Sequence, residues 1–329
     1  MLHFYQSNRL EKLADNLAGI LEKTPLGDPF EKETILVLSR PMQHWLSLVL
    51  AGRSGIWANA SFPFPLKFFD EVFRLNLGVA FPDPYPFDAD VMIWQIMVSI
   101  RNHMQEKEFS PIRRYLEQDG DGFKVYQLAG RIAGLMDQYM TYRPGLIESW
   151  KSGSSRKPDE QWQAALWQDI VASAGDAKNR AEVAVLFLRK FRDKPPACLP
   201  PRLSVFGVCA LPPVYLDVLD CIARHTDVHV FMLNPCQEYW CDIEAKRVIT
   251  RRAADRKRGR PLNADDDHAE VGNSLLASMG ALGREFMSVV LRYDTCWEHE
   301  SFEEPGEATA LGQVQTRILR LEELPEKLD

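Results

Sequence analysis

The chain has 329 residues, of which 46% are hydrophobic and 26% are charged. These proportions are typical of a globular protein and exclude a disordered or collagen-like chain, and the length suffices for roughly two domains. The net charge of −7 excludes a surface that is basic throughout. Any DNA contact must therefore come from a local basic channel, because nearby Lys and Arg side chains set the attraction to phosphate.

The first residues and the cysteines indicate a compartment. The opening MLHFYQSNRLEKL has no basic segment followed by an apolar one, and no later apolar run approaches the roughly 18 residues that a membrane span needs. The six cysteines include no CxxC pair and are interpreted as reduced, buried thiols. We therefore expect a cytoplasmic protein without a membrane partner.

Strands and helices alternate at the start of the chain. LHFY predicts a first strand, and apolar residues at helical spacing over 10–21 predict a helix, with Asn8 and Glu11 as a capping box. The run TILVLS at 34–39 predicts a second strand that is covered on both faces. The elements expected next are a helix from Pro41 to Gly52, a strand over 55–61 and a short helix over 68–75.

Helical spacing alone governs the middle of the chain. The helices expected there cover 87–104, 124–142, 161–173 and 180–191. After a proline-rich segment, alternation returns, with strands expected over 203–208 and 228–233 and a helix over 213–225.

This order of elements predicts an α/β fold with a parallel sheet and right-handed crossovers. The sheet domain would be formed by residues 1–81 together with 195–329. An inserted all-helical domain would cover 82–194.

Two runs of like charge follow the last of these strands. RVITRRAADRKRGR at 247–260 is basic and ADDDHAE at 264–270 is acidic. A solvated loop is the favoured interpretation of 246–270, and contact with phosphate or with a partner protein stays open. Asp265, Asp266, Asp267 and His268 could hold a divalent ion, but a solvated acidic loop is again favoured. A helix over 275–291 and an acidic tail are expected to close the chain.

The chemistry of nucleotide hydrolysis is missing. The segment SRPMQHWLS at 39–47, in the turn after the second predicted strand, is where we expect a phosphate loop, but it has neither glycine nor lysine, and Pro41 removes an N–H donor. The strand over 203–208 leads to Cys209 and not to the acidic residues that hold Mg²⁺. We therefore expect no catalytic residue, no metal and no cofactor. An active helicase or nuclease, which needs such groups, is the less favoured alternative.

Eight tryptophans could stack nucleobases. Most of them lie on predicted apolar helix faces, so we interpret them as core or subunit interface. Trp57 and Trp240, which lie beside predicted loops, are the favoured exceptions.

Seven segments carry a family resemblance that spans nearly the whole chain. They are YQSNRLEKLADNL, DPFEKETILVLSRPMQHWL, GIWANASFPFPLKF, GLMDQYMTYRP, VFGVCALPPVYLDVLDCIARH, NPCQEYWCDI and VGNSLLASMGALGRE. Together they resemble the N-terminal third of the gamma-subunit (RecC) family of exodeoxyribonuclease V. Family members are far longer, which implies that this chain is a fragment. The family resembles a superfamily 1 helicase with decayed ATP-binding motifs, which implies a degenerate P-loop-NTPase-like sheet domain (1A-like) and a helical insertion (1B-like).

The resemblance implies a non-catalytic subunit of a RecBCD-type helicase–nuclease in double-strand break repair and homologous recombination. Its implied partners are single- and double-stranded DNA, the beta (helicase–nuclease) subunit and the alpha (helicase) subunit. It would help to split the duplex, channel the 3′ strand and scan it for a regulatory, Chi-like sequence. A purely structural scaffold that never contacts bases stays open as an alternative.

The resemblance also implies DNA-contacting residues. Leu135, Asp137 and Arg143 in GLMDQYMTYRP match best, and Arg180 matches more weakly. Arg can bind a phosphate or a guanine edge, a carboxylate can accept from an exocyclic amine, and an apolar side chain can support an unstacked base. Alternatively, Asp137 and Arg143 pair with other side chains or cap the helix before Pro144.

Three channel positions depart from the family pattern. Phe64 stands where Leu is usual, Asp70 where Trp is usual, and Arg40 where a small hydroxyl residue is frequent. A carboxylate does not stack on a base as an aromatic ring does. The resemblance therefore implies DNA contacts at Phe64 and Arg40 but a recognised sequence that differs from the family's.

Overall fold

The computed structural model describes residues 1–329 except 29, 118–121, 154–159, 245–271, 294–296 and 325–329. Two compact units make up the chain. The first comprises Met1–Phe68, Leu199–Leu211 and Leu219–Asp329, and the second comprises Phe69–Cys198 and Pro212–Val218. The expected domains, 1–81 with 195–329 and 82–194, stay a prediction.

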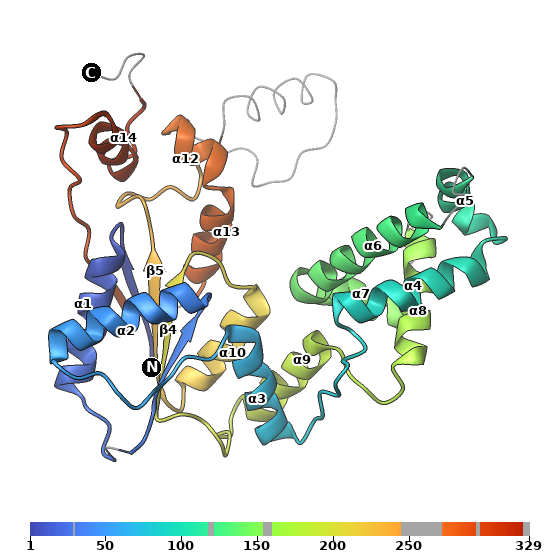
Figure 1. The fold of residues 1–329 in the computed structure, drawn as a ribbon, viewed down its shortest axis with the longest axis horizontal. Coiled ribbons are helices and arrows are strands. Elements are labelled where there is room, and N and C mark those ends of the chain that lie inside the picture. Colours follow the sequence, from blue (N-terminus) through green and yellow to red (C-terminus); the bar gives the residue numbers. More distant parts are fainter. Residues whose placement is uncertain (29, 118–121, 154–159, 245–271, 294–296, 325–329) are drawn as a thin grey trace. The chain divides into compact units, whose positions relative to one another are not determined.

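A parallel β-sheet forms the centre of the first unit (Figure 1). Its six strands among the described residues are β1 (Leu2–Ser7), β2 (Glu33–Val37), β3 (Ala60–Ser61), β4 (Arg202–Val208), β5 (Asp227–Leu233) and β6 (Trp297–Glu300). Their order across the sheet is β3-β2-β4-β5-β1-β6, and every neighbouring pair is parallel. The predicted α/β class with a parallel sheet is confirmed.

Strand order reverses at β1. From β1 the chain crosses to β2 on one side of it, whereas from β5 it passes over β1 to β6 on the other side. Ligands of open α/β sheets bind beyond the carboxyl ends of the strands at such a reversal. A second reversal lies between β2 and β4, because β2 connects to β3 on one side and β4 connects to β5 on the other. The turns after β1 and after β2 therefore both lie at such positions, and the choice of the turn after β2 stays a prediction.

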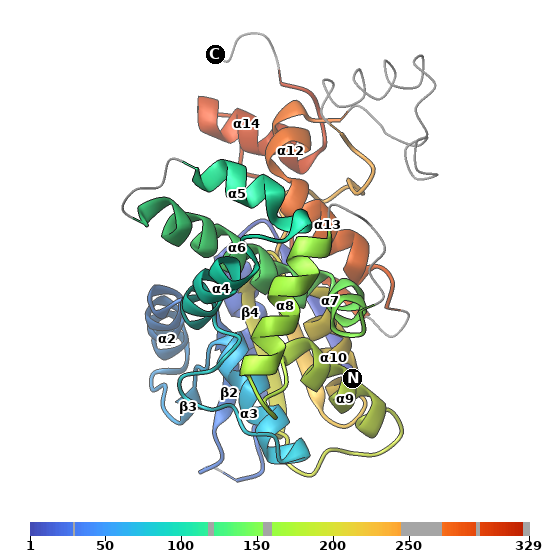
Figure 2. The ribbon, with the colours of Figure 1, turned by 90° about the vertical axis from the view of Figure 1, so that its right-hand side faces the viewer.

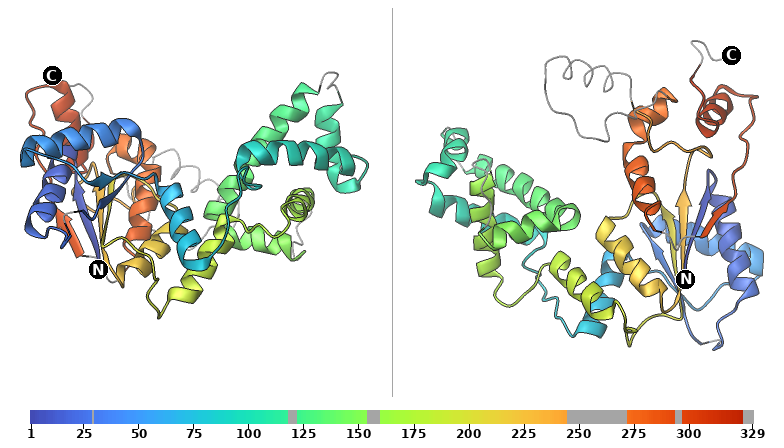
Figure 3. Two further views of the ribbon diagram at one scale, coloured as in Figure 1. Left: turned by 60° about the horizontal axis from the view of Figure 1, so that its bottom comes forward. Right: turned by 180° about the vertical axis from the view of Figure 1, so that it is seen from behind.

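Helices cover both faces of this sheet. Figure 3 shows α1 (Leu10–Lys23) and α2 (Arg40–Ser54), in blue, on one face and α13 (Ala281–Val290), in orange, on the other. The buried faces of α1 and α2 share one apolar core with Tyr5 and Phe231 of the sheet. Burial of this kind is the main favourable contribution to folding.

Several predicted elements of the first unit differ from those observed. The strand expected over 55–61 is only Ala60–Ser61, because Gly55 (φ 76°) and Asn59 (φ 61°) are left-handed and interrupt extended backbone. The helix expected over 275–291 is two helices, α12 (Ser274–Met279) and α13, which meet at Gly280. The tail contains α14 (Ala310–Leu319).

The predicted capping box at the start of α1 is wrong. Arg9 is the residue before the helix, and its N–H donates to Ser7 Oγ at 3.0 Å. The side chain of Asn8 instead donates to the carbonyl of Glu303 at 2.7 Å. A partner almost three hundred residues away has thus replaced the local cap.

The described residues of the second unit form helices and loops. Its helices are α3 (Pro65–Leu77, from Phe69), α4 (Ala89–His103), the 3₁₀ turn Lys107–Phe109, α5 (Ser110–Leu116), α6 (Phe123–Tyr142), α7 (Pro144–Lys151), α8 (Gln161–Ser173), α9 (Arg180–Phe191) and the first half of α10 (Pro213–Ala223). Figure 2 shows α4 beside α6 and α8, and their apolar faces share a core that includes Met92, Ile132 and Trp167.

Two further expectations can be compared with the structure. Cys221 and Cys236 are buried and Cys241 is half-buried, as expected, but Cys198 and Cys209 are exposed. None of the helices that the structure describes is long and apolar enough to cross a membrane.

Candidate nucleic-acid interface

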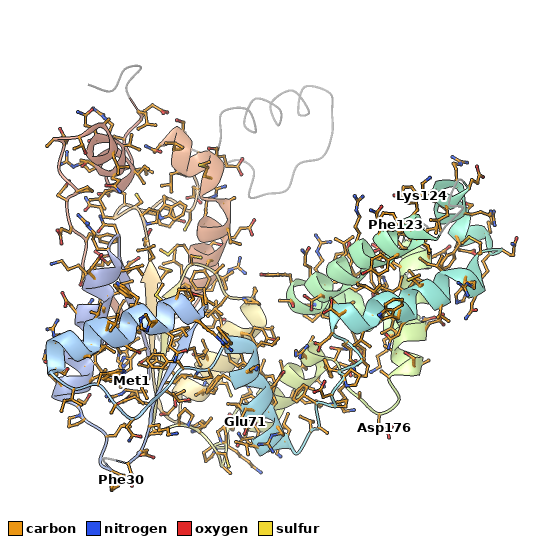
Figure 4. The ribbon with its side chains drawn as sticks, in the orientation of Figure 1. Met1, Phe30, Glu71, Phe123, Lys124 and Asp176 are labelled. Carbon is orange, nitrogen blue, oxygen red and sulfur yellow. The ribbon has the colours of Figure 1, made fainter. Side chains whose placement is uncertain are left out.

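Two predicted contact residues are exposed on opposite flanks of the buried face of α6, since residues two apart in a helix point about 200° away from each other. The helix begins at Phe123 and Lys124, labelled in Figure 4, and buries one side in the core of the unit. Leu135 is 45% exposed and Asp137 is also exposed. An apolar and an acidic side chain are thus presented to solvent from a rigid helix.

Arg143 occupies the corner between α6 and α7. Its N–H donates to the carbonyl of Tyr139 at 2.8 Å, and its own carbonyl accepts from the N–H of Leu146 at 2.9 Å. Pro144 then begins α7, where a missing N–H costs nothing. Backbone groups therefore cap these helix ends, and the exposed guanidinium, 5.8 Å from the ring centroid of Tyr139, forms no ion pair with any described residue.

Arg180, the first residue of α9, lies in a different environment. The side chain of Asn179 caps this helix by accepting from the N–H of Glu182 at 3.0 Å, so the helix begins at Arg180. The Arg180 guanidinium donates to Asp70 at 3.1 Å and to Asp88 at 2.9 Å. Its central carbon also lies 4.4 Å from the ring centroid of Tyr85.

These groups form a cluster, which we call the Arg180 clamp: Asp70, Tyr85, Asp88 and Arg180. Burial raises the pKa of Asp70, although hydrogen bonding to Arg180 opposes this shift. Loss of hydration also raises the pKa of Asp137, and again the charge of Arg180 opposes it. Two carboxylates neutralise Arg180 from within the unit, so it offers a phosphate less free charge than Arg143 does.

Sequence analysis did not assign the carboxylates of the Arg180 clamp to Arg180. Asp70 was singled out only as a departure from the family pattern, and Asp88 was not singled out at all. An acidic residue standing where the family has an aromatic one was the available signal, because a half-buried carboxylate needs a cation.

Phe64 and Arg40 belong to the first unit and follow neighbouring strands. Arg40 is the exposed first residue of α2, three residues beyond the end of β2. Phe64 is half-buried and follows β3, next to Pro63, whose carbonyl accepts from the N–H of Val37 at 3.4 Å. Because β2 and β3 pair in parallel, both residues lie at the carboxyl edge of the sheet. The structure leaves all six DNA contacts as predictions.

Of the two tryptophans suggested for stacking, Trp240 was wrongly chosen, whereas Trp57 stays a prediction. Trp240 is 2% exposed, and its Nε1–H donates to Asn234 Oδ1 at 3.1 Å. Trp57 packs partly buried against the core under α1 and α2. Trp94 on α4, by contrast, is 63% exposed. Proximity to a predicted loop was a poor guide, since loops can fold over an indole.

Some sequence-based candidates lie outside the described residues. These are the charged segment 246–270, with its possible cation ligands Asp265, Asp266, Asp267 and His268, and the thiol of Cys296. Within the part of the chain that is described, no group of three or more His, Cys, Asp and Glu side chains is placed to hold a metal ion.

The fold and the comparisons with known proteins define the class and then the family. A parallel sheet covered on both faces, with its order reversed at β1, is compatible with the P-loop NTPase class of α/β proteins. A family model described as the N-terminal domain of RecC matches residues 2–321, and the chain belongs to this family.

Three similar proteins carry the name RecBCD enzyme subunit RecC. That of Haemophilus influenzae is 33% identical over 99% of this chain and 34% of its own length. That of Escherichia coli is 33% identical over 98% of this chain and 31% of its own length. That of Mycolicibacterium smegmatis is 30% identical over 96% of this chain and 28% of its own length. The chain therefore spans about a third of the length of these relatives.

Proposed function

We propose that the chain is the N-terminal part of a non-catalytic subunit of a RecBCD-type helicase–nuclease that acts in double-strand break repair by homologous recombination. It would join the beta and alpha subunits in the cytoplasm, help to split duplex DNA, channel the 3′ single strand and scan it for a Chi-like sequence. Family membership and the names of the relatives support this proposal. We also propose that residues 1–81 and 195–329 form its helicase-like domain and 82–194 the inserted helical domain.

One observation carries the strand-scanning part of the proposal. Leu135, Asp137 and Arg143 present an apolar, an acidic and a basic side chain to solvent within two and a half turns of backbone around the end of α6. An unstacked base can rest on the first, an exocyclic amine of another nucleotide can donate to the second, and a phosphate can be bound by the third. Rigid helices hold all three, as sequence readout requires.

The absence of catalysis is supported by the residues at the carboxyl edge of the sheet. The turn after β1 reads Ser7, Asn8 and Arg9, without the glycines of a phosphate loop. Strand β4 leads to Cys209 and Ala210, without a carboxylate for Mg²⁺. Removal of ATP should therefore leave any DNA contact of this chain unchanged.

A scaffold without base contacts is the second candidate, and the Arg180 clamp favours it. A guanidinium that two carboxylates and a tyrosine ring already hold is an internal link. If all predicted contact residues behaved in this way, the fold would serve only to bind partner subunits.

Charge reversal separates the two candidates. In the assembled complex, Arg143→Glu should weaken single-strand binding roughly tenfold and lower the slope of log K against log salt by about 0.7, as expected for one lost phosphate contact. Arg114→Glu on α5 is the matched control, because Arg114 is exposed in the same unit and the change in net charge is identical. Equal binding by both variants and the unaltered protein would favour the scaffold.

A further inference from the structure

The carboxyl edge of β1 is covered by the chain's own residues. The segment Ser301–Glu303, which we call the strap, follows β6 and runs along the end of β1. The N–H of Ser301 donates to the carbonyl of Gln6 at 2.9 Å, and Ser7 Oγ donates to the carbonyl of Ser301 at 2.7 Å. The strap therefore lies at a reversal of strand order, where this class of fold places its ligand.

Asn8 and Glu303 hold the end of the strap. Asn8 Nδ2 donates to the Glu303 carbonyl at 2.7 Å, and the N–H of Glu303 donates to Asn8 Oδ1 at 3.0 Å. Asn16 on α1 adds a bond from its Nδ2 to Ser301 Oγ at 3.0 Å. The side chains of Ser7, Asn8 and Asn16 thus hold the two ends of the strap, Ser301 and Glu303.

Glu303 also supplies a negative charge to the start of α1. Its carboxylate lies 3.3 Å from Lys12 Nζ and 4.0 Å from Arg9 Nη2. Lys12 lies in the first turn of the helix, as the lysine of a phosphate loop does. An anion at this position is favoured by the free N–H groups and the dipole of the helix.

Beneath the strap, the edge is closed by buried polar side chains. Gln6 Nε2 donates to Glu300 at 3.1 Å, and Gln6 Oε1 accepts from Asn234 Nδ2 at 2.9 Å. Asn234 in turn accepts from the indole of Trp240 at 3.1 Å. Gln6 and Asn234 are 6% and 4% exposed, so their hydrogen-bonding capacity is turned inward and is used within the protein.

We propose that the strap is an internal replacement for an anionic ligand. Backbone groups of Ser301 and Glu303 fill the edge of β1, and the Glu303 carboxylate takes the charge position that the phosphates of a nucleotide would take. The first unit is therefore ordered at this edge without a nucleotide. None of the residues that hold the strap is among the predicted DNA-contacting residues.

The test compares two strap variants with a matched control in the full chain. Asn8→Ala removes both reciprocal hydrogen bonds, and Glu303→Gln removes only the charge. Glu304→Gln is the control, because Glu304 is the neighbouring acid but pairs with Arg320 at 3.0 Å. The measurement is amide hydrogen exchange of 301–303 and of 7–12, with and without sodium pyrophosphate at constant ionic strength.

We expect the Glu303 amide to exchange at least tenfold faster in Asn8→Ala and unchanged in Glu304→Gln. Pyrophosphate should slow exchange over 7–12 in Glu303→Gln but not in the unaltered or control protein. Unchanged exchange in Asn8→Ala would refute the strap. If Asn8→Ala does not fold, Glu303→Gln alone decides, since an exposed charge change leaves the hydrogen bonds in place. If pyrophosphate slowed exchange over 7–12 in the unaltered chain, or in none of the proteins, the proposal that the strap replaces an anion would be refuted.

Discussion

Two roles are open to Arg180, a structural one within its unit and a DNA-contacting one. Its side chain is 17% exposed and is shared between Asp70 and Asp88. Removing one partner of a poorly solvated ion pair leaves the other charge uncompensated, which costs more than the pair contributes. A structural role therefore predicts a loss of stability, and a DNA-contacting role predicts a loss of binding.

Arg180→Met should lower the free energy of unfolding by about 2–3 kcal/mol, because Asp70 loses its main cation. Urea unfolding followed by circular dichroism measures this. Arg74→Met is the control, since Arg74 pairs with Glu71 and both side chains are 53% exposed, and it should leave stability nearly unchanged. An Arg180→Met protein that is fully stable but binds strand poorly would assign Arg180 to the DNA.

His229 should make the first unit sensitive to acid. It is 7% exposed, stacks on His3 with ring centroids 4.9 Å apart, and lies 3.3 Å from Tyr5 Oη. Burial lowers the pKa of His229 to about 4, and burial also lowers the pKa of His3. Because the folded form takes up a proton less readily than the unfolded form, the stabilisation is complete above about pH 6.5 and is lost as pH falls toward 4.

As pH falls through this window, protonation of His229 alone should lower the free energy of unfolding by up to about 3 kcal/mol. His229→Phe should flatten the pH dependence of unfolding between pH 6.5 and 4.5, as measured by urea titration at each pH. His225→Gln, at an exposed position of the same unit, should keep the slope of the unaltered protein. A slope that does not change in His229→Phe would mean that other groups cause the acid sensitivity.

At the scale of elements, the sequence predicted best those helices whose ends are set by interactions between neighbouring residues. Helices α8 and α9 begin and end where periodicity placed them, and Asn179 caps α9 as such residues commonly do. Strand β6 was not predicted, because WEHE carries little apolar signal and its place beside β1 depends on pairing across the sheet. The helix over 275–291 failed for a similar reason, since Trp240 fills the space beside Gly280.

In the candidate site, too, the features that neighbouring residues set could be predicted, and the contacts between distant residues could not. The exposure of Leu135, Asp137 and Arg143 agrees with an amphipathic α6, whose pattern the sequence contains. The Arg180 clamp and the strap join residues more than ninety positions apart, and one sequence without its fold does not pair them. The departure from the family pattern could indicate that Asp70 needed a cation, but not which one.

Gly280 should tolerate no side chain. A Cβ there would lie 2.8 Å from Trp240 Cζ3 and 2.5 Å from the Leu276 carbonyl oxygen. Gly280→Ala should therefore destabilise the first unit by about 2 kcal/mol, despite the better helix propensity of alanine. In Gly19→Ala on α1, where the added Cβ meets nothing within 4 Å, the propensity should instead stabilise by about 0.5–1 kcal/mol. Thermal unfolding of both variants decides, and equal effects would contradict this packing.

At the scale of the whole molecule, the two units have different tasks in the proposed function. The first has the sheet topology of a ligand-binding fold but fills its own edge with the strap. The second presents exposed side chains around the end of α6. Activity of such a protein would depend on partner subunits, which agrees with relatives that are named as one subunit of an enzyme.

The most direct test places a photocrosslinker at Leu135 in the full-length subunit, within the reconstituted complex bound to a DNA end. p-Benzoylphenylalanine at this exposed position should crosslink to the 3′ single strand on illumination. The same group at Tyr115 on α5, which is 50% exposed in the same unit, is the control and should give no crosslink. Crosslinking to DNA at position 135 alone is the predicted result, and crosslinking only to a partner subunit would contradict a strand-contacting role for this surface.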